Sequence, residues 1–561
     1  MQKALWMKNW PAGMPRTVSF KHGRIPLFEY LRADAREHPD KAAILYYGRA
    51  VTYRELDESS DRVANALAGM GIRKGGRVAL FMENCPQYVI AHYGIQKAGA
   101  VVVPCSPMFK EWELEHELAD SGAEILICLD HLYPIAQAVR GRTNLRKVVV
   151  TSFRDYLPSR PSLPLHPSME GEKKSFAGTL DWFQLLADYE ARAPDVEIDL
   201  QEDLALLQYT AGTTGLPKGA MLTHYNALFK TAAAGQLIDL ILGANLRALT
   251  VMPIFHIAGM LAGVNLPVYV GGTAVMLSRF TVESFVKAVD LYQCNVAYVA
   301  VPMAVAVLQF PELSRYDLSS LAAFPYTLST SFGIALTDEI SEAWKKVAGS
   351  ALAETSYGLT ETHTADTIKL PGAPARSVGV PTFETELKIV DFETGTRETA
   401  PGEPGEIVVR GPGLFKGYWN HPEATAAVLR DGWFHTGDAG MIDENGWFYF
   451  LERVKDMLKC SGYSVFPAEV EEFLRKHPAV QNAAVIGIPD PVRGESVKAC
   501  IVLKPEFRGK VTAEEIVEWS RQKMAVYKSP RTVEFVDELP VSGVGKVLKR
   551  VLREKSVGPG S

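Results

Sequence analysis

One glycine-rich segment, YTAGTTGLPKG at residues 209–219, has residue types that suit phosphate chemistry. A P-loop reads G-x-x-x-x-G-K-[ST], whereas here Lys218 follows Pro217 and precedes Gly219, so no Ser or Thr stands beside the lysine to reach Mg²⁺. Glycines let backbone N–H groups gather round an anion, and hydroxyl and ammonium groups add donors. The residues that offer these properties are Thr210, Gly212, Thr213, Thr214, Gly215, Lys218 and Gly219. Taken alone, the segment fits either an anion-binding loop or a glycine-rich surface turn.

A second segment, YGLTET at residues 357–362, places an aromatic ring, a hydroxyl and a carboxylate close together. The ring of Tyr357 can stack on a base, Thr360 can hold a phosphate or carboxylate oxygen, and Glu361 can ligate Mg²⁺. These are the groups that a nucleotide site needs besides a phosphate loop.

A third segment, WFHTGD at residues 433–438, ends in Asp438. A carboxylate that binds both hydroxyls of a ribose must be held in one orientation, and we expect Thr436 and Gly437 to supply a tight turn that does so. In isolation an acid after a glycine is usually only part of a turn or a cap. The three segments together, in this order, favour a nucleotide-binding enzyme.

The segments around these motifs predict the elements that must position them. The runs GRVALFME, GAVVVPCS, AEILICLD and LRKVVVTS read as buried strands, and CPQYVIAHYGIQKAG between the first two reads as a helix, which favours α/β units with largely parallel strands. LALLQYT predicts a strand before the glycine-rich segment, and LTHYNALFKTAAAGQL predicts a helix after it, capped near Thr223. The proline-rich residues 158–175 predict a surface loop.

From Pro401 onward the sequence changes to short strands and tight turns. Asn445-Gly446 between two alternating apolar segments predicts a β-hairpin. After it, PAEVEEFLRKHP and AEEIVEWSRQKM predict helices, and VQNAAVIGIPD and SVKACIVLK predict strands, so the end of the chain reads as a small α+β unit. We expect an α/β fold with a large N-terminal domain at residues 1–452, which includes a small β-rich subdomain, a hinge at 453–455, and a small mobile C-terminal domain at 456–561.

The chain has 561 residues, which is too long for one compact core, and its composition is that of an ordinary globular protein. A net charge of −6 gives no general attraction to nucleic acid or to an anionic membrane, so no nucleic-acid partner is expected. Six scattered cysteines without a C-x-x-C pair indicate buried thiols in a reducing compartment rather than disulfides or a zinc site. The apolar residues 251–272 contain prolines, His256 and Asn265, and so predict a buried core segment rather than a membrane span. We expect a cytoplasmic protein, monomer or homodimer, with peripheral membrane contact left open.

The ordered motifs resemble those of the adenylate-forming superfamily of acyl-CoA synthetases, adenylation domains and beetle luciferases. The matching segments are VTYRELD, YTAGTTGLPKG, PIFHIAGM, YGLTET, WFHTGD, ERVKDMLKCSGYSVFPAEVE and LPVSGVGK, which span nearly the whole chain. Within the superfamily, WPAGMP and CPQYVIAHYGIQKAGAVVVPCSPM look most like medium- and long-chain fatty acid–CoA ligases.

The resemblance implies a role for each motif. ATP and an acid would form an acyl-adenylate with loss of pyrophosphate, and the thiol of CoA would then displace AMP. The glycine-rich loop would cover the β- and γ-phosphates, Thr210 and Glu361 would hold Mg²⁺, and Thr360 would contact the α-phosphate. Tyr357 would cover the adenine, and Asp438 with Arg453 would hold the ribose.

The resemblance also assigns residues to the mobile domain and to the acyl site. Lys546 would reach between the carboxylate and the α-phosphate during adenylation, and the small domain would then rotate about Lys455. Lys459 and Gly462 would face the pantetheine tunnel, where a side chain at the glycine would block the thiol. His256 would form a gate or floor of the acyl site, although a lone histidine in an apolar stretch is more often a core residue.

Three departures from the superfamily pattern bear on these roles. Ala211 replaces a common serine in the glycine-rich loop, and PVSGVGK carries valines where basic and hydroxyl residues are usual. In STSFGIAL, which we align on Gly333 with a GGAPL-like turn, the bulky Phe332 and Ile334 would reshape or shorten the acyl tunnel.

The leading hypothesis is an ATP-dependent fatty acid–CoA ligase for medium to long chains, with Mg²⁺ as cofactor and ATP and CoA as co-substrates. The first alternative keeps the chemistry but changes the acid to an aryl, cinnamate-like or short branched one. Transfer to a carrier protein is a lesser alternative, and luciferase activity is the weakest of this class. A P-loop ATPase or kinase and an inactive nucleotide-binding protein are the alternatives from other classes.

Overall fold

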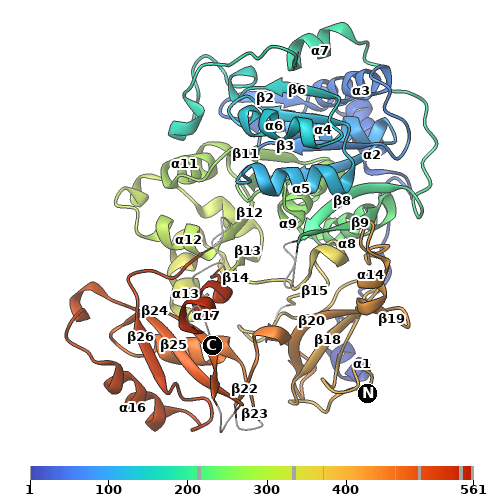
Figure 1. The fold of residues 1–561 in the computed structure, drawn as a ribbon. Coiled ribbons are helices and arrows are strands. Elements are labelled where there is room, and N and C mark those ends of the chain that lie inside the picture. The colour runs from blue at the N-terminus through green and yellow to red at the C-terminus, as the bar shows by residue number, and fades with distance from the viewer. Residues whose placement is uncertain are drawn as a thin grey trace.

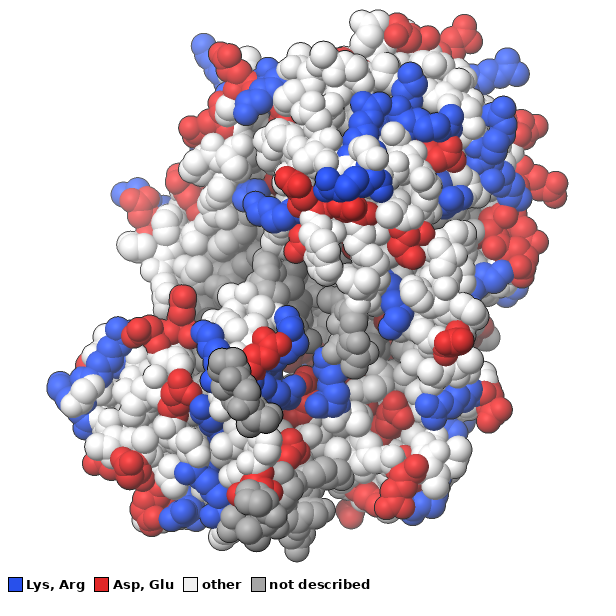
Figure 2. Space-filling view, in the orientation of Figure 1, with Lys and Arg blue, Asp and Glu red and all other residues white. Residues whose placement is uncertain are grey.

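The computed structural model describes residues 2–210, 216–331, 336–370, 372–460, 463–490, 494–541 and 547–557. Figure 1 shows two sheets stacked with their helices in one half of the molecule, and a β-rich unit beside a C-terminal unit in the other half. The predicted α/β class is confirmed, because parallel strands alternate with helices over the first two-thirds of the chain. On the face that Figure 2 shows, Lys and Arg side chains are interspersed with Asp and Glu side chains.

The first sheet has seven strands in the order β7-β6-β5-β3-β4-β8-β9. The strands are β3 (Arg77–Phe81), β4 (Val101–Cys105), β5 (Ile125–Leu129), β6 (Lys147–Thr151), β7 (Leu180–Asp181), β8 (Leu204–Thr210) and β9 (Lys218–Thr223). All pairs are parallel except β8 with β9. The four apolar runs predicted as buried strands are β3 to β6, as expected for a sheet covered on both faces. The short strand β9, directly after the glycine-rich loop, was not expected.

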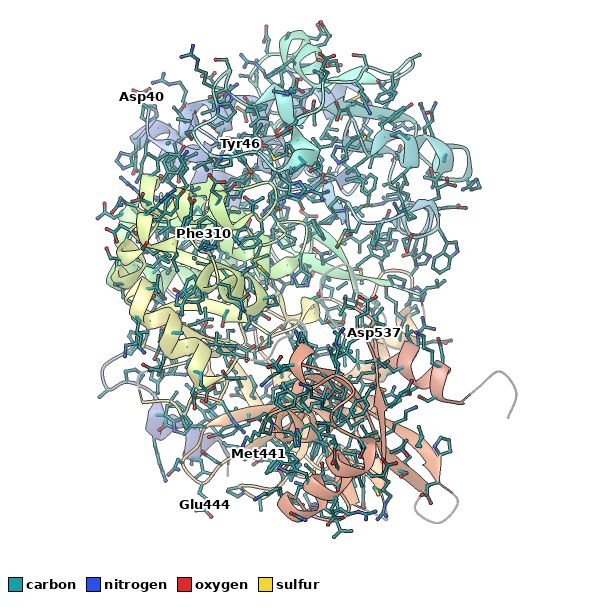
Figure 3. The ribbon with its side chains drawn as sticks, turned by 90° about the vertical axis from the view of Figure 1, so that its left-hand side faces the viewer. Asp40, Tyr46, Phe310, Met441, Glu444 and Asp537 are labelled. Atoms are coloured by element: carbon teal, nitrogen blue, oxygen red, sulfur yellow. The ribbon has the colours of Figure 1, made fainter. Side chains whose placement is uncertain are left out.

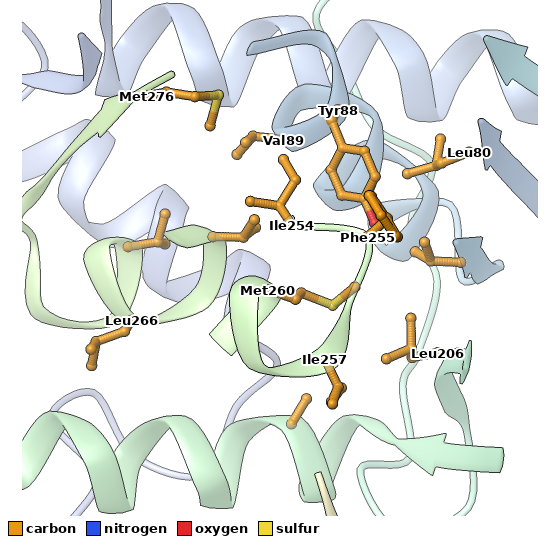
Figure 4. Packing of buried hydrophobic residues seen from close by; sticks show 14 of the residues in the cluster. Leu80, Tyr88, Val89, Leu206, Ile254, Phe255, Ile257, Met260, Leu266 and Met276 are labelled. Atoms are coloured by element: carbon orange, nitrogen blue, oxygen red, sulfur yellow. The ribbon is translucent and has the colours of Figure 1, made fainter. Parts of the chain in front are cut away.

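Helices cover this sheet and separate it from the second one. They are α2 (Leu27–Glu37), α3 (Tyr53–Gly69), α4 (Pro86–Lys97), α5 (Glu111–Ser121), α6 (Tyr133–Val139), α7 (Trp182–Asp188) and α8 (His224–Ile241). Every residue of α4 is buried, which explains why its sequence lacks a polar face. Figure 4 shows Tyr88 and Val89 of α4 packed towards Ile254, Phe255 and Met276, which belong to the same apolar core.

The second sheet also has seven strands, in the order β14-β13-β12-β10-β11-β1-β2. The strands are β1 (Ala42–Tyr46), β2 (Arg49–Thr52), β10 (Arg247–Thr250), β11 (Thr273–Met276), β12 (Val296–Ala300), β13 (Tyr326–Thr330) and β14 (Ala351–Ala353). Its helices include α11 (Val282–Tyr292), α12 (Val301–Leu308) and α13 (Asp338–Ala348). Asn84, three residues after β3, joins the two sheets, because its amide donates to Met252 O (3.0 Å) and Leu277 O (3.2 Å) and accepts from Ile254 N (2.9 Å).

The apolar residues 251–272 form α9 (Ile257–Met260), a π-helical turn (Leu261–Asn265) and α10 (Leu266–Val270) inside this core. This confirms the predicted buried segment. In the part of the chain that the structure describes, no helix is long and apolar enough to cross a membrane.

The β-rich unit contains β17 (Glu386–Val390), β18 (Gly405–Arg410), β19 (Leu429–Arg430), β20 (Trp433–Ile442) and β21 (Phe448–Arg453), with α14 (Pro422–Val428) beside them. Near it β15 (Thr367–Ile368) pairs with β16 (Val380–Pro381). The predicted Asn445-Gly446 hairpin is confirmed, since β20 and β21 pair antiparallel around it and Gly446 has φ +87°. Figure 3 shows Met441 and Glu444 of this hairpin region at the lower end of the molecule, far from Tyr46 of β1. The N-terminal helix α1 (Gln2–Trp6) is tied to the same unit by the Gln2 amide, which donates to Ile389 O (3.0 Å).

The C-terminal unit follows a short 3₁₀ turn (Val454–Asp456). It contains β22 (Leu458–Cys460), β23 (Tyr463–Val465), β24 (Val480–Asp490), β25 (Gly494–Leu503) and β26 (Thr532–Phe535), with α15 (Pro467–Arg475), α16 (Ala513–Lys523) and α17 (Lys549–Val557). The predicted order of helix and strand is confirmed, and the unit has its own apolar cores. Lys549 of α17 bridges Glu452 (2.8 Å) and Glu471 (3.0 Å), on either side of the 3₁₀ turn.

The proline-rich residues 158–175 differ in part from the expected surface loop. They contain one 3₁₀ turn (Pro167–Met169), and Leu163 and Met169 are buried against the main core. These two apolar side chains hold the segment against the core, because removing apolar surface from water is favourable in free energy.

Candidate active site

The glycine-rich loop connects two antiparallel strands. Thr210 at the end of β8 is paired with Lys218 at the start of β9, so the two polar residues that flank the loop lie opposite each other. The predicted helix follows as α8, and Thr223 caps it through a capping box with Asn226. Gly212, Thr213, Thr214 and Gly215 lie outside the described residues. A P-loop joins a strand directly to a helix N-terminus, and the intervening strand β9 sets this loop apart from it.

Helix α5 anchors the chain on both sides of the loop. The Tyr209 hydroxyl donates to Asp120 Oδ2 (2.6 Å), and His116 Nε2 lies 2.9 Å from Pro217 O. Burial, followed by the hydrogen bond to Asp120, raises the pKa of Tyr209 well above its ordinary value, so the hydroxyl stays a donor. Side chains of α5 therefore fix both ends of the loop, and no sequence motif predicted this association.

Glu361 lies in a 3₁₀ turn (Thr360–Thr362) that packs against β9. Glu361 is buried, with 8% of the residue exposed, and its Oε1 accepts a hydrogen bond of 2.7 Å from the Tyr418 hydroxyl. The ammonium of Lys218 lies 5.6 Å from the centre of the Tyr418 ring. The structure thus brings together two predicted site residues, Lys218 and Glu361, through a tyrosine that was not among the predicted site residues.

The backbone after Glu361 is strained. His363, Thr364 and Ala365 have φ of +54°, +60° and +51°, which non-glycine residues rarely adopt. A buried ion pair closes this turn: Lys230 Nζ of α8 lies 2.6 Å from Asp366 Oδ1 and donates to Ala365 O (3.1 Å). Burial lowers the pKa of Lys230 and raises that of Asp366, and the attraction between the two charges opposes both shifts.

The residues predicted to hold adenine and ribose form one hydrogen-bonded group. The Tyr357 hydroxyl donates to Asp438 Oδ2 (2.6 Å), and Arg453 NH1 lies 2.8 Å from Asp438 Oδ1. The ring of Tyr357 stacks at 6.0 Å on Phe450, which is partly exposed on β21. Burial, then the charge of Asp438, raises the pKa of Tyr357 well above its ordinary value.

The local structure around Asp438 corrects one expectation. Residues 436–438 do not form a tight turn but lie within strand β20, where Gly437 has φ +69° and its N–H donates to Glu406 Oε1 (3.0 Å). Pairing of Asp438 with Arg453 across β20 and β21 holds the carboxylate instead. A bulged strand fixes an acid as firmly as a turn does, because neighbouring strands supply the hydrogen bonds.

His256 precedes α9 and caps it, with Nδ1 accepting from Ala258 N (3.4 Å). The side chain is solvent-accessible, yet surrounding protein desolvates it and lowers its pKa. The solvent exposure of the side chain distinguishes it from a core histidine. Further along the chain, Gly259, Ala262 and Gly263 line a small apolar cavity against β10, β12 and β13. Figure 4 shows Ile257 and Met260, the first and last residues of α9, packed in the main core.

Several predicted site residues cannot be placed. Gly333, Gly462 and Lys546 lie outside the described residues, as do Phe332 and Ile334. Lys459 belongs to β22, but its side chain is not described. Lys455 is exposed in the 3₁₀ turn between β21 and β22, where a hinge was expected.

Comparisons with known proteins agree with this arrangement. The chain matches AMP-binding enzymes over residues 31–419 and the C-terminal domain of AMP-binding enzymes over residues 469–546. It is 38% identical to a long-chain-fatty-acid–CoA ligase of Bacillus subtilis over 98% of both chains, and 37% identical to a feruloyl-CoA synthase of an Amycolatopsis species over 93% of this chain and 97% of the relative. An anthranilate CoA ligase solved in complex with anthranoyl-AMP has a TM-score of 0.80 at 29% identity, and the match covers 94% of this chain and 96% of that one. The chain therefore belongs to the AMP-binding enzymes, within the acyl-CoA synthetase branch of the adenylate-forming superfamily.

Proposed function

We propose that the protein is an ATP-dependent fatty acid–CoA ligase for medium to long chains. A carboxylate oxygen of the acid attacks the α-phosphorus of ATP and pyrophosphate leaves, and the CoA thiolate then attacks the acyl carbon and AMP leaves. The observation that carries the proposal is the full-length similarity to a long-chain-fatty-acid–CoA ligase. The hydrogen bonds of Tyr357 with Asp438 and of Glu361 with Tyr418 support it, because they fix residues predicted to bind the nucleotide.

The described side chains suit the nucleotide. Asp438 and Arg453 would hold the ribose. The ring of Tyr357, oriented by the hydrogen bond from its hydroxyl to Asp438, would stack on the adenine. Thr210 and Lys218 stand at the two ends of the loop that would cover the β- and γ-phosphates, with Gly212, Thr213, Thr214 and Gly215 between them. Thr360 would contact the α-phosphate.

The site fits a magnesium ion that arrives with the nucleotide. Mg²⁺ in such enzymes is held by one or two carboxylates together with substrate phosphates and water. Glu361, nearly buried and oriented by one hydrogen bond, supplies such a carboxylate beside β9, and Thr210 would supply a hydroxyl. When bound, the ion would neutralise charge on the phosphates.

Two conformations would serve the two half-reactions. Residues 1–452 would form the body and residues 456–561 a lid that rotates about residues 453–455, with Lys455 as the hinge residue. Lys546 would act in adenylation, and Lys459 and Gly462 would line the path of the CoA thiol after rotation. We expect a cytoplasmic monomer or homodimer.

The acid class has one serious alternative. A feruloyl-CoA synthase at 37% identity and the anthranilate CoA ligase fold favour an aryl acid with the same chemistry. The apolar cavity beside α9, with a volume of about 20 Å³, is too small for either an alkyl chain or a ring. Exchange of labelled pyrophosphate into ATP, measured with acetate, octanoate, palmitate, benzoate and ferulate, tests the proposal. Exchange that needs octanoate or palmitate supports the fatty acid class, exchange with ferulate or benzoate alone supports the alternative, and exchange with none contradicts both.

Replacing Asp438 by asparagine is expected to weaken ATP binding by about 10- to 100-fold, because a charge-assisted hydrogen bond contributes about 1.5–3 kcal/mol. The wild-type protein should prefer ATP over its 2′,3′-dideoxy analogue, whereas the variant should bind the two alike. Equilibrium binding of both nucleotides measures this, and an unchanged preference in the variant would place the ribose elsewhere.

A further inference from the structure

We propose that Tyr418 is a positioning residue of the nucleotide site, which orients Glu361 for the metal and shapes the surroundings of Lys218. The inference rests on the proposed function, because it assigns Glu361 to Mg²⁺·ATP. Tyr418 is in none of the motifs singled out from the sequence; it comes from the segment FKGYWN, some 57 residues after Glu361.

The segment that carries Tyr418 is fastened to the strand that follows the phosphate loop. Met221 N of β9 donates to Gly417 O (3.0 Å), and Trp419 N donates to Gly219 O (2.8 Å), so residues 417–419 extend the first sheet beside β9. Thr425 Oγ1 accepts from Tyr418 N (2.8 Å). The tyrosine therefore moves with the base of the phosphate loop.

The same segment holds Glu361 at two points. Phe415 N donates to Glu361 O (2.8 Å), and the Tyr418 hydroxyl donates to Glu361 Oε1 (2.7 Å). The first bond fixes the backbone and the second fixes the rotation of the carboxylate.

The ring of Tyr418 has a separate role. It packs edge-to-face on Phe415 at 4.9 Å, and the Lys218 ammonium lies 5.6 Å from its centre. A cation over an aromatic face is attracted by the ring quadrupole. One side chain thus contacts both the predicted metal ligand and the predicted phosphate lysine, and its hydroxyl and its ring can be removed separately.

Tyr418→Phe tests the hydroxyl, because it keeps the packing and the contact with Lys218. Binding of ATP is measured by calorimetry without any acid, once with Mg²⁺ and once with EDTA. We expect the variant to bind Mg²⁺·ATP about tenfold more weakly than wild type and metal-free ATP equally well. In turnover, the Mg²⁺ concentration for half-maximal rate should rise, while KM for the fatty acid stays unchanged.

Tyr449→Phe is the matched control. Its hydroxyl donates to Asp443 Oδ2 (3.0 Å) on the β20–β21 hairpin, where Tyr449 pairs with Met441, so the variant loses the same kind of bond outside the site. This variant should bind both forms of ATP as wild type does. Tyr418→Leu removes the ring as well, and we expect it to weaken metal-free ATP too; its thermal unfolding is followed alongside.

Equal binding of Mg²⁺·ATP by wild type and Tyr418→Phe would overturn the inference, as would an equal loss for Mg²⁺·ATP and metal-free ATP. If the wild-type protein activates no acid, the proposed function fails, yet the binding comparison still decides the role of Tyr418. The two ideas are therefore distinguishable in one set of measurements.

Discussion

Replacing Lys546 by alanine is expected to lower the rate of acyl-adenylate formation by about 10²–10³-fold, the loss that follows removal of one donor at a developing negative charge. The step brings an anionic carboxylate onto the phosphorus of a polyanion, so a cation between the two is needed only in that transition state. Formation of the thioester from supplied acyl-adenylate and CoA should remain largely intact, because Lys546 would have rotated away by then.

The two half-reactions are measured separately, as acid-dependent pyrophosphate exchange and as acyl-CoA formation from synthetic acyl-adenylate. Lys555→Ala, which removes an exposed lysine of α17, is the control and should change neither. Equal losses in both half-reactions of Lys546→Ala would contradict the two-conformation scheme for this chain.

Replacing Lys230 by methionine is expected to destabilise the protein by about 3–5 kcal/mol, because it leaves the Asp366 carboxylate buried without its partner. Both side chains are 1% exposed, so solvent does not screen the charge that remains. The strained turn at residues 363–365 would also lose the hydrogen bond from Lys230 to Ala365 O.

The double variant Lys230→Met/Asp366→Leu is the matched comparison. Removing both charges avoids the uncompensated carboxylate, and the Thr362 hydroxyl, which donates to Asp366 in the wild type, has an alternative acceptor in Leu359 O at 3.1 Å. We expect it to recover most of the loss in urea and thermal unfolding. A double variant as unstable as Lys230→Met would mean that packing at this position, rather than the buried charge, sets the cost.

The sequence predicted best those features that depend on neighbouring residues. Strands β3 to β6 and the Asn445-Gly446 hairpin follow from local apolar patterns and turn chemistry, and α8 begins where Thr223 and Asn226 form a capping box. The strand β9 was not predicted, because the segment at residues 218–223 is short and adjoins a glycine-rich loop. Its identity as a strand depends on pairing with β8, which is a tertiary contact.

The candidate site was predicted only in part, for the same reason. Tyr357, Asp438 and Arg453 come together as the motifs implied, but the tight turn expected at Asp438 was wrong because pairing of β20 with β21 overrides the local turn signal of Thr436-Gly437. The bonds of Glu361 with Tyr418 and of Lys230 with Asp366 join residues 57 and 136 positions apart. No local pattern encodes such partners, so only the folded chain reveals them.

The fate of the carboxylate oxygens tests the central claim most directly. Palmitate labelled with a heavy oxygen isotope in its carboxylate is converted with Mg²⁺, ATP and CoA, and the products are weighed by mass spectrometry. If the acid attacks the α-phosphorus, one labelled oxygen must appear in AMP and none in pyrophosphate. Label in inorganic phosphate, with ADP as the nucleotide product, would mean an acyl-phosphate route and would contradict the assignment of an acyl-adenylate to this protein.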